Sequence, residues 1–311
     1  MKLLLDFSLV KNNFSMAIQQ EMFWETPSVH VLFGASGCGK SHLLRSICGL
    51  ETIKGSIVFN DIIWDKQTGN NQRSQFTLPS HKRNVAMVFQ DNQLFSHLNV
   101  KQNLMFALER SSANTDDFNL CVKQLNISHL LDHSVSALSG GEKQRISIAR
   151  SLLSKPDLLL MDEPLASLDW KSKLEILPFI QTICRTWNLP ILYVTHSIDE
   201  VMQLADHVYL INKNEKICSI DQSGPLTDVL MDINNPFNQH PDACSLLMGN
   251  IKQEGFQQDG LIKVQLAEQF IYLTQAIANP STKVRLNVQA KDVSISLSHA
   301  MDSSILNILN G

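Results

Sequence analysis

Apolar and polar positions follow patterns that change along the chain, and these changes mark the expected elements. Period-two alternation over Leu3–Val10 and Phe14–Ile18 predicts two strands, and the apolar run Val29–Phe33 predicts a buried one. Residues 100–138 are polar-rich with a helical pattern. The other expected elements are a strand followed by a turn over 54–61, strands at 84–89, 158–161, 191–194 and 208–211, and helices at 142–153, 171–187 and 198–205. This order predicts an α/β fold with a mostly parallel sheet and helical crossovers.

The pattern changes again beyond residue 235, where helical signal gives way to Asn, Gln and Pro. Short strand-like runs then follow at Leu261–Leu266, Phe270–Leu273, Val284–Val288 and Val293–Leu297. We therefore expect a first domain over 1–235 with a helical insertion at about 91–138, a linker over 236–250 and a β domain over 251–311.

Composition narrows the function classes. The 311 residues include 26 Lys and Arg against 30 Asp and Glu, and this net charge of -4 argues against a nucleic-acid partner. The six cysteines lack paired metal-type spacing, and the start does not resemble an export signal, so a reducing cytosol is the expected location. No apolar run approaches the ~20 residues of a membrane helix. Any membrane role is therefore expected to depend on a partner.

A glycine-rich segment between an expected strand and an expected helix is the sharpest motif. It consists of Gly34, Ala35, Ser36, Gly37, Cys38, Gly39, Lys40 and Ser41. Glycines let successive N–H groups and the helix N-terminus converge on phosphate oxygens. Lys40 is placed to reach the β- and γ-phosphates, and Ser41 to bind Mg²⁺. The alternative is an ordinary glycine-rich turn. A thiol at Cys38 predicts inactivation by a maleimide and protection by ATP.

Two adjacent carboxylates, Asp162 and Glu163, end the apolar run Leu158–Met161. Isolated buried carboxylates are unfavourable, so a positive partner is implied. Beside a phosphate-binding loop, Asp162 is a candidate Mg²⁺ ligand and Glu163 a candidate base for the attacking water. The alternative is a strand that ends in solvated acids.

A second glycine-containing segment comprises Ser139, Gly140, Gly141 and Glu142. The spacing of Ser139 and Glu142 fits a helix capping box, which is one explanation of the segment. Capping does not require two glycines, each of which costs about 1 kcal/mol against Ala inside a helix. Exposed amides at a helix start suggest a second phosphate cradle. Because the chain has one P-loop, this cradle is expected to serve the nucleotide of another copy.

Taken in order, these motifs resemble the ATP-binding cassette (ABC) ATPase family over residues 1–231. The resemblance rests on residues 34–41, Gln90 in Val88–Asp91, Leu138–Glu142, Asp162–Glu163, Ser167–Asp169 and Thr195–Ser197. It implies a P-loop cassette with an antiparallel β subdomain and a helical insertion. It also implies a homodimer in which Ser139, Gly140 and Gly141 of one subunit close over ATP and Mg²⁺ bound to the other.

The resemblance also implies roles for single residues, each with a simpler explanation. Gln90 resembles the glutamine that contacts Mg²⁺ and the water, although a lone Gln can be a turn residue. His196 resembles the switch histidine that bonds the γ-phosphate, although a strand-end His is more often structural. Asp169 resembles an aspartate that works across the dimer, and it could equally cap the following helix. Phe14 stands where the family has an aromatic ring on adenine, and core packing is the alternative.

In the family, such subunits act with an integral membrane permease at the cytoplasmic face of the bacterial inner membrane. The helical insertion is then expected to form a groove for a cytoplasmic permease helix, with Phe95, His97 and Leu98 as contact candidates. A periplasmic solute-binding protein would take part indirectly. These partners are implied by the resemblance alone.

The tail bears on the solute. Residues 289–297 and 303–311 resemble the oxyanion-binding β module of importer ATPases, and the chain as a whole most resembles molybdate-importer subunits. The family pattern would continue into further strands, so this module is expected to be partial. An importer of another solute, such as sulfate, tungstate, ferric iron or polyamine, stays open as an alternative. A soluble ABC ATPase without a transport role is a further alternative.

Overall fold

The structure is a computed structural model that describes residues 1–11, 14–67, 75–214, 217–232, 237, 244–256, 261–273, 283–289, 293 and 307. The chain forms two compact units, Met1–Leu226 and Thr227–Gly311. The first unit holds all of the motifs singled out in the sequence outside the tail. Each unit is described by itself below.

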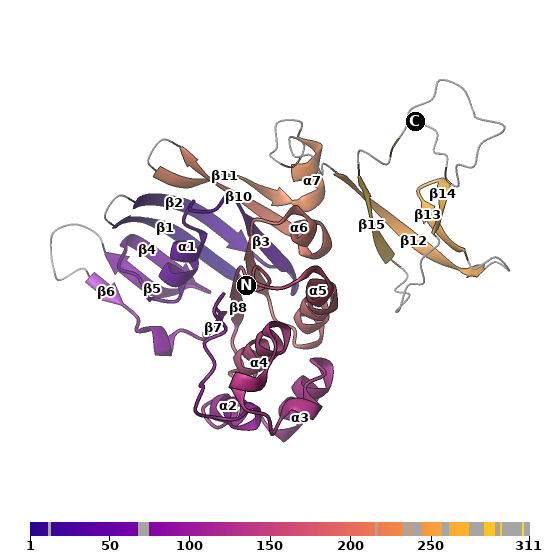
Figure 1. The fold of residues 1–311 in the computed structure, drawn as a ribbon. Coiled ribbons are helices and arrows are strands. Elements are labelled where there is room, and N and C mark those ends of the chain that lie inside the picture. Colours follow the sequence, from indigo (N-terminus) through magenta and orange to yellow (C-terminus); the bar gives the residue numbers. More distant parts are fainter. Residues whose placement is uncertain are drawn as a thin grey trace. The chain divides into compact units, whose positions relative to one another are not determined.

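An eleven-stranded sheet is the framework of the first unit (Figure 1). Its order is β6-β5-β4-β1-β2-β11-β10-β3-β9-β8-β7. The neighbours β10, β3, β9, β8 and β7 run parallel to one another. These strands span His207–Asn214, Val29–Phe33, Ile191–Thr195, Leu158–Asp162 and Val85–Val88 respectively. The prediction of a mostly parallel α/β sheet with helical crossovers is confirmed.

The central strands are apolar because they are covered on both faces. All five residues of β8 and all five of β9 are buried, as expected of a strand in the middle of a parallel sheet. Burying each large apolar side chain contributes roughly 1.5–3 kcal/mol, so these two short segments hold much of the unit together. The same apolar runs made both strands recognisable in the sequence.

The other part of the sheet is antiparallel except for the parallel pair β2–β11. Strands β1 (Lys2–Lys11) and β2 (Phe14–Phe23) pair along their whole length, and β4 (Lys54–Phe59) lies on the other side of β1. Three strands that the sequence analysis did not predict complete the sheet: β5 (Ile62–Gln67), β6 (Gln75–Thr77) and β11 (Ile217–Pro225). Strands β6 and β11 are mostly exposed or half-buried and carry no strong apolar signal, and β5 has only a short apolar start, residues 62–64.

Helices cover the sheet and extend beyond it. Helices α4, α5 and α6 follow one another beside the parallel strands, and α2 and α3 lie together next to α4 (Figure 1). The helices are α1 (Lys40–Ile47), α2 (Val100–Leu108), α3 (Thr115–Gln124), α4 (Gly140–Leu152), α5 (Trp170–Thr186), α6 (Ile198–Leu204) and α7 (Leu226–Met231). Within the described ranges, no helix combines the length and apolar character needed to cross a bilayer.

The second unit contains a four-stranded antiparallel sheet in the order β14-β13-β12-β15. These strands are β12 (Cys244–Phe256), β13 (Ile262–Leu266), β14 (Gln269–Leu273) and β15 (Lys283–Gln289). Residues 244–250, assigned to a linker from the sequence, form the first part of β12, because their backbone pairs with β15. The last expected strand, Val293–Leu297, lies outside the described residues apart from Val293.

Candidate functional site

The carboxyl ends of four parallel strands bring the candidate residues to one edge of the sheet. Phe33 at the end of β3 pairs in register with Thr195 at the end of β9, and Asp162 at the end of β8 pairs with Val194. Ligands of parallel sheets bind at this kind of edge, because the loops that follow the strands converge there. The loop after each strand carries one of the motifs found in the sequence.

The glycine-rich loop turns from β3 directly into α1. Gly37 and Gly39 have φ values of 83° and 89°, in the left-handed region that glycine adopts without strain. Gly39 is also the N-cap residue of α1 and has no side chain with which to cap it, so the amides at the helix start remain directed at the loop. The loop thus has the backbone form of an anion-binding nest.

Lys40 folds back over this loop. Its Nζ donates to the carbonyl oxygens of Gly34 and Ala35, both at 2.9 Å, and lies 3.3 Å from Oε1 of Glu163. The side chain is only 3% exposed, so its charge acts in a region of weak solvent screening. One ammonium group therefore links the glycine loop to the end of β8.

Ser41 and Asp162 form a pair of oxygen ligands beside the lysine. The Ser41 hydroxyl donates to Oδ1 of Asp162 at 2.9 Å. Burial is the main reason that the pKa of the Asp162 carboxyl is raised, and the hydrogen bond from Ser41 opposes this rise. A buried carboxylate next to a hydroxyl fits Mg²⁺, which prefers oxygen ligands and would favour the charged form of Asp162. The donor set therefore agrees with the metal expected from the sequence.

Glu163 joins the loop, the lysine and His196. Its Oε2 lies 3.0 Å from Nδ1 of His196, and its backbone N–H donates to the Val194 carbonyl at 3.1 Å. Glu163 has a φ of 43°, an uncommon value for a residue with a side chain, and such strain often occurs at functional sites. The structure thus brings Lys40, Glu163 and His196 together, as a shared catalytic role requires.

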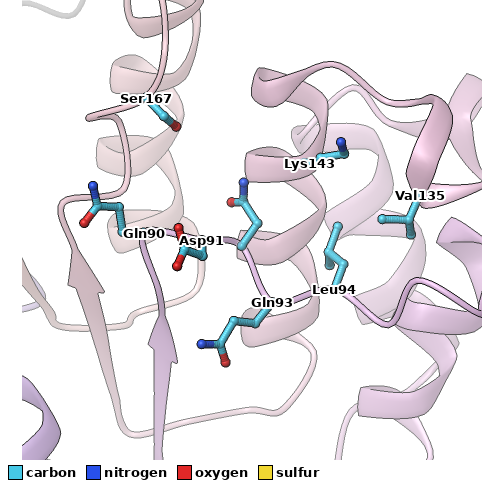
Figure 2. A pocket seen from close by; sticks show the side chains of 8 residues that line it. Gln90, Asp91, Gln93, Leu94, Val135, Lys143 and Ser167 are labelled. Atoms are coloured by element: carbon cyan, nitrogen blue, oxygen red, sulfur yellow. The ribbon is translucent and has the colours of Figure 1, made fainter.

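A cavity of about 390 Å³ lies beside the end of β7. Figure 2 shows Gln90 and Asp91 at the end of this strand, Lys143 on α4 and Ser167 on a loop. Gln90 is exposed and lines this cavity. Gln90 therefore lies at the edge of the sheet where the other candidate residues meet. Its role in contacting Mg²⁺ and the attacking water stays a prediction.

Phe14 lies against the glycine loop. A Cβ atom built on Gly39 would stand 2.4 Å from Cζ of Phe14, so the ring and the loop are in direct contact. The Phe14 ring is half-buried, and its centroid lies 4.8 Å from the centroid of the His42 ring. His42 turns away from the loop, and its Nδ1 is 3.0 Å from Oε1 of Glu51. A half-exposed ring beside a phosphate loop is compatible with adenine stacking, which stays a prediction.

The Cys38 thiol differs from what the sequence suggested. Its side chain is buried and donates to the carbonyl of Ala35. Burial raises the pKa of Cys38, and the nearby charge of Lys40 offsets only part of this rise. Because the thiolate is the reactive form, the expectation of a readily alkylated thiol does not hold for this structure.

The second glycine segment begins α4. Ser139 is the N-cap, and its hydroxyl accepts from the Glu142 amide at 3.3 Å while Glu142 Oε2 accepts from the Ser139 amide at 2.8 Å. This capping box is the simpler explanation offered above, and it accounts for Ser139 and Glu142. It does not require the glycines. A Cβ on Gly141 would make an ordinary contact with Ser172 at 3.5 Å, and one on Gly140 would make a close contact of 3.3 Å with Leu168 Cδ2.

Asp169 also acts as a cap within its own chain. Its Oδ1 accepts from the Ser172 amide at 3.0 Å and its Oδ2 from the Ser172 hydroxyl at 2.8 Å. These hydrogen bonds, the one from the backbone first, lower the pKa of Asp169. The helix-capping alternative is therefore present, and a role across a dimer stays a prediction.

A buried polar cluster that was not predicted from the sequence lies next to the site. Glu200 accepts hydrogen bonds from Tyr193 and Thr195 and pairs with Lys173. The available signal was weak, because Glu200 stands next to a second acid, Asp199, in the helix pattern after His196. Periodicity predicted this helix, and it could not predict that Glu200 faces inward.

The sequence is similar to a known family and to several named proteins. The profile of a family described as "ABC transporter" matches residues 21–166. The chain is 42% identical over 287 residues to the "Molybdenum import ATP-binding protein ModC" of Vibrio parahaemolyticus, covering 90% of this chain and 74% of the relative. It is 37% identical to the protein of the same name from Haemophilus influenzae, covering 99% of this chain and 85% of the relative.

Solved structures share the fold. The protein cbiO1 from Clostridium perfringens, part of the ABC transporter complex cbiONQ, aligns with a TM-score of 0.60 at 24% identity, covering 76% of this chain and 93% of that one. A dimeric ATP-binding cassette bound to ADP and phosphate aligns with a TM-score of 0.57 at 20% identity, covering 73% of this chain and 99% of that one. Both alignments support the α/β architecture described above.

Proposed function

This chain belongs to the family of ABC transporter ATP-binding subunits, and from that premise we propose that it hydrolyses ATP to drive molybdate import through a membrane permease. One observation carries the proposal of hydrolysis: Lys40 and His196 both contact Glu163, beside the Ser41–Asp162 pair. Molybdate is proposed because relatives that are 37–42% identical over most of the chain are named as molybdenum import proteins.

The proposed chemistry assigns one task to each group. The glycine loop and Lys40 bind the β- and γ-phosphates and stabilise their negative charge. Glu163 orients the attacking water and accepts its proton at Oε1 or Oε2. His196, whose Nδ1 contacts Glu163, holds the γ-phosphate with its other ring nitrogen, and Gln90 completes the water and metal contacts. Phe14 supports the adenine ring.

Ser41 and Asp162 are the proposed protein ligands of Mg²⁺, with Gln90 as a third contact. When bound, Mg²⁺ neutralises charge on the phosphate oxygens. Asp162 supplies a negative charge from a buried position, and Ser41 supplies a neutral oxygen at 2.9 Å from it.

A homodimer is proposed from the surface formed by residues 139–141. Gly141 leaves the start of α4 without a side chain although its own chain has room for a methyl group. A methyl group on the exposed Gly140 would lie 3.3 Å from the end of the Leu168 side chain, which would have to yield slightly. A close approach by something outside the chain explains this choice better than the internal packing does. We assign that position to ATP bound by the partner subunit, with Ser139 as its hydrogen-bonding group and Asp169 at the same interface.

The permease is proposed to dock on the helical part of the first unit. Asn103 in α2 holds the preceding loop, because its side chain bonds the backbone of Phe95 and the carbonyl of Leu98. Phe95 packs edge-on against Phe106 with ring centroids 4.8 Å apart. This firm loop, together with His97, is a suitable platform for a cytoplasmic helix of the permease. The site of action is then the cytoplasmic face of the inner membrane, and a periplasmic molybdate-binding protein delivers the solute.

The Glu163→Gln variant tests hydrolysis. It keeps the size of the side chain and removes the proton acceptor, so ATP binding is expected to persist while kcat falls by more than about 100-fold. Fluorescent-nucleotide titration and phosphate release measure the two quantities. Full turnover in this variant would refute the role assigned to Glu163.

The same variant tests the dimer. Glu163→Gln is expected to change from monomer to dimer when ATP and Mg²⁺ are added, as measured by size-exclusion chromatography with light scattering. Adding Gly140→Leu should prevent the dimer and leave ATP binding intact. Gly140→Ala should still form the dimer, because its methyl group would lie 3.3 Å from the end of the Leu168 side chain, which can yield by a few tenths of an ångström. A dimer that forms equally well with Leu at this position would place the interface elsewhere.

The solute is tested with the reconstituted permease. ATPase stimulation by a molybdate-loaded binding protein is compared with stimulation by its sulfate-loaded form and by a ferric-iron or polyamine importer system. Selective stimulation by molybdate is the expected result. Stimulation only by another system would reassign the solute and leave the ATPase assignment untouched.

A further inference from the structure

A buried carboxylate lies directly behind the loop that carries His196. Glu200 in α6 is 3% exposed. Its Oε2 accepts from the Tyr193 hydroxyl at 2.9 Å and from the Thr195 hydroxyl at 2.7 Å, and its Oε1 lies 3.1 Å from Nζ of Lys173. A buried charge requires such partners, because its desolvation is otherwise very unfavourable. One side chain thus joins α5, β9 and α6.

The Thr195 hydroxyl extends this contact to both sides of His196. It donates to Glu200 and accepts from the Ser197 amide at 3.0 Å. Burial, and then the charge of Glu200, raises the pKa of Tyr193, so that its hydroxyl stays protonated and acts as a donor. Glu200 therefore holds Thr195, the residue before His196, directly, and Thr195 in turn holds Ser197, the residue after it.

Lys173 connects Glu200 to the turn before α5. It lies in the first turn of α5, where its backbone N–H donates to the Asp169 carbonyl at 3.0 Å. The adjoining residue Leu168 lies next to the start of α4, within 3.3 Å of a Cβ built on Gly140. The backbone of Lys173 is thus bonded to the turn that borders the surface proposed to meet the partner subunit, and its ammonium group contacts Glu200.

We propose that Glu200 and Lys173 form a positioning pair, which couples the interface formed by residues 139–141 and 167–169 to the orientation of His196. This inference rests on the proposed function. A movement of the first turn of α5 displaces Lys173, and Glu200 transmits that displacement through Thr195 to His196. His196 in turn contacts Glu163 at 3.0 Å. The pair makes catalysis in one subunit depend on contacts made by the other.

Buried ion pairs can also be purely structural, and the two roles predict different kinetics. A structural pair affects the fraction of folded protein and leaves the folded enzyme active. A positioning pair affects turnover of the folded enzyme, because misplacing a catalytic group by about 1 Å can lower the rate by up to about 100-fold. ATP binding by the glycine loop should be unchanged in the second case, since neither Glu200 nor Lys173 contacts that loop in any hydrogen bond or ion pair described.

The test compares Lys173→Met, Lys173→Arg and Glu200→Gln with the wild-type protein. Lys173→Met and Glu200→Gln are expected to lower kcat by about 10- to 100-fold with the dissociation constant for ATP changed less than about twofold. They should also lower the Hill coefficient for ATP towards one. Lys173→Arg keeps the charge and should restore most of kcat. Lys171→Met is the matched control, because Lys171 is an exposed lysine in the same helical turn.

A double variant completes the experiment. Lys173→Met with Glu200→Gln should be no slower than the poorer single variant, because both changes break one connection. Unchanged kcat and Hill coefficient in the folded single variants, whatever their melting temperatures, would overturn the inference. So would a failure of Lys173→Arg to rescue turnover. A wild-type protein without ATPase activity would instead refute the proposed function, so the two failures are distinguishable.

Discussion

Replacing Asp65 should destabilise the first unit strongly, because it leaves a buried guanidinium without its counter-charge. The Arg83 side chain is 0% exposed, and its Nη2 lies 2.6 Å from Oδ2 of Asp65, which is 4% exposed. The same guanidinium donates to the carbonyls of Leu78, Ser46, Ile47 and Trp64 at 3.0, 3.1, 2.8 and 3.4 Å. Arg83 thus fastens the antiparallel strands to the carboxyl end of α1.

The magnitude follows from these contacts. Removing one partner of a buried ion pair lowers the free energy of unfolding by about 3–5 kcal/mol. Because the guanidinium keeps its contacts with the carbonyl groups, we expect a loss near the lower end of this range, about 3 kcal/mol, for Asp65→Ala. Arg83→Met should cost at least as much, because it leaves Asp65 and the end of α1 without donors. Removing both charges with Asp65→Leu and Arg83→Met should cost less than the sum of the single changes.

Urea unfolding followed by tryptophan fluorescence measures these effects. All four tryptophans lie within the first unit, so the signal reports on that unit alone. Glu109→Ala is a suitable control, since the Glu109 side chain is exposed and its ion pair with Arg110 is exposed as well. A loss of less than about 1 kcal/mol in Asp65→Ala, or strict additivity in the double variant, would refute the reasoning.

Two further predictions concern the candidate site. Cys38 should react with a maleimide more than about tenfold more slowly than a free thiol at pH 7.5, because burial raises its pKa. Mass spectrometry measures the rate of labelling, with the Cys38→Ser variant as the control for the other cysteines. Rapid labelling of Cys38 would contradict the prediction. The pKa of the Asp162 carboxyl is raised above 3.8, so the folded state binds the carboxyl proton more tightly than the unfolded state does. The contribution of Asp162 to the free energy of unfolding therefore falls as the pH rises from 3.8 through the pKa of the folded state. Asp162→Asn should therefore be at least as stable as wild type at pH 7.5 without nucleotide. It should lose the extra thermal stabilisation that Mg²⁺ adds to ATP, and retention of that increment would exclude Asp162 as a ligand.

Local sequence determined much of this protein. The apolar runs at β3, β8 and β9 specify buried parallel strands, because strands covered on both faces have no polar side. The glycine loop required only its own residues and its flanking elements to be recognised. Capping by Ser139 and Asp169 was likewise readable, since a cap depends on side chains within three residues of it.

Tertiary structure decided the features that join distant segments. Arg83 meets Asp65 and α1, Lys40 meets Glu163, and Glu200 meets Lys173, and each contact joins groups at least 18 residues apart. Hydrophobic periodicity indicates on which face of a helix or strand a residue lies. It does not indicate which charged residue of another segment packs against that face. The mostly exposed strands β6 and β11 were missed for a related reason, because their backbone pairing rather than their apolar content makes them strands. The Cys38 thiol was misjudged because its reactivity depends on burial, which only the packed sheet and loop create.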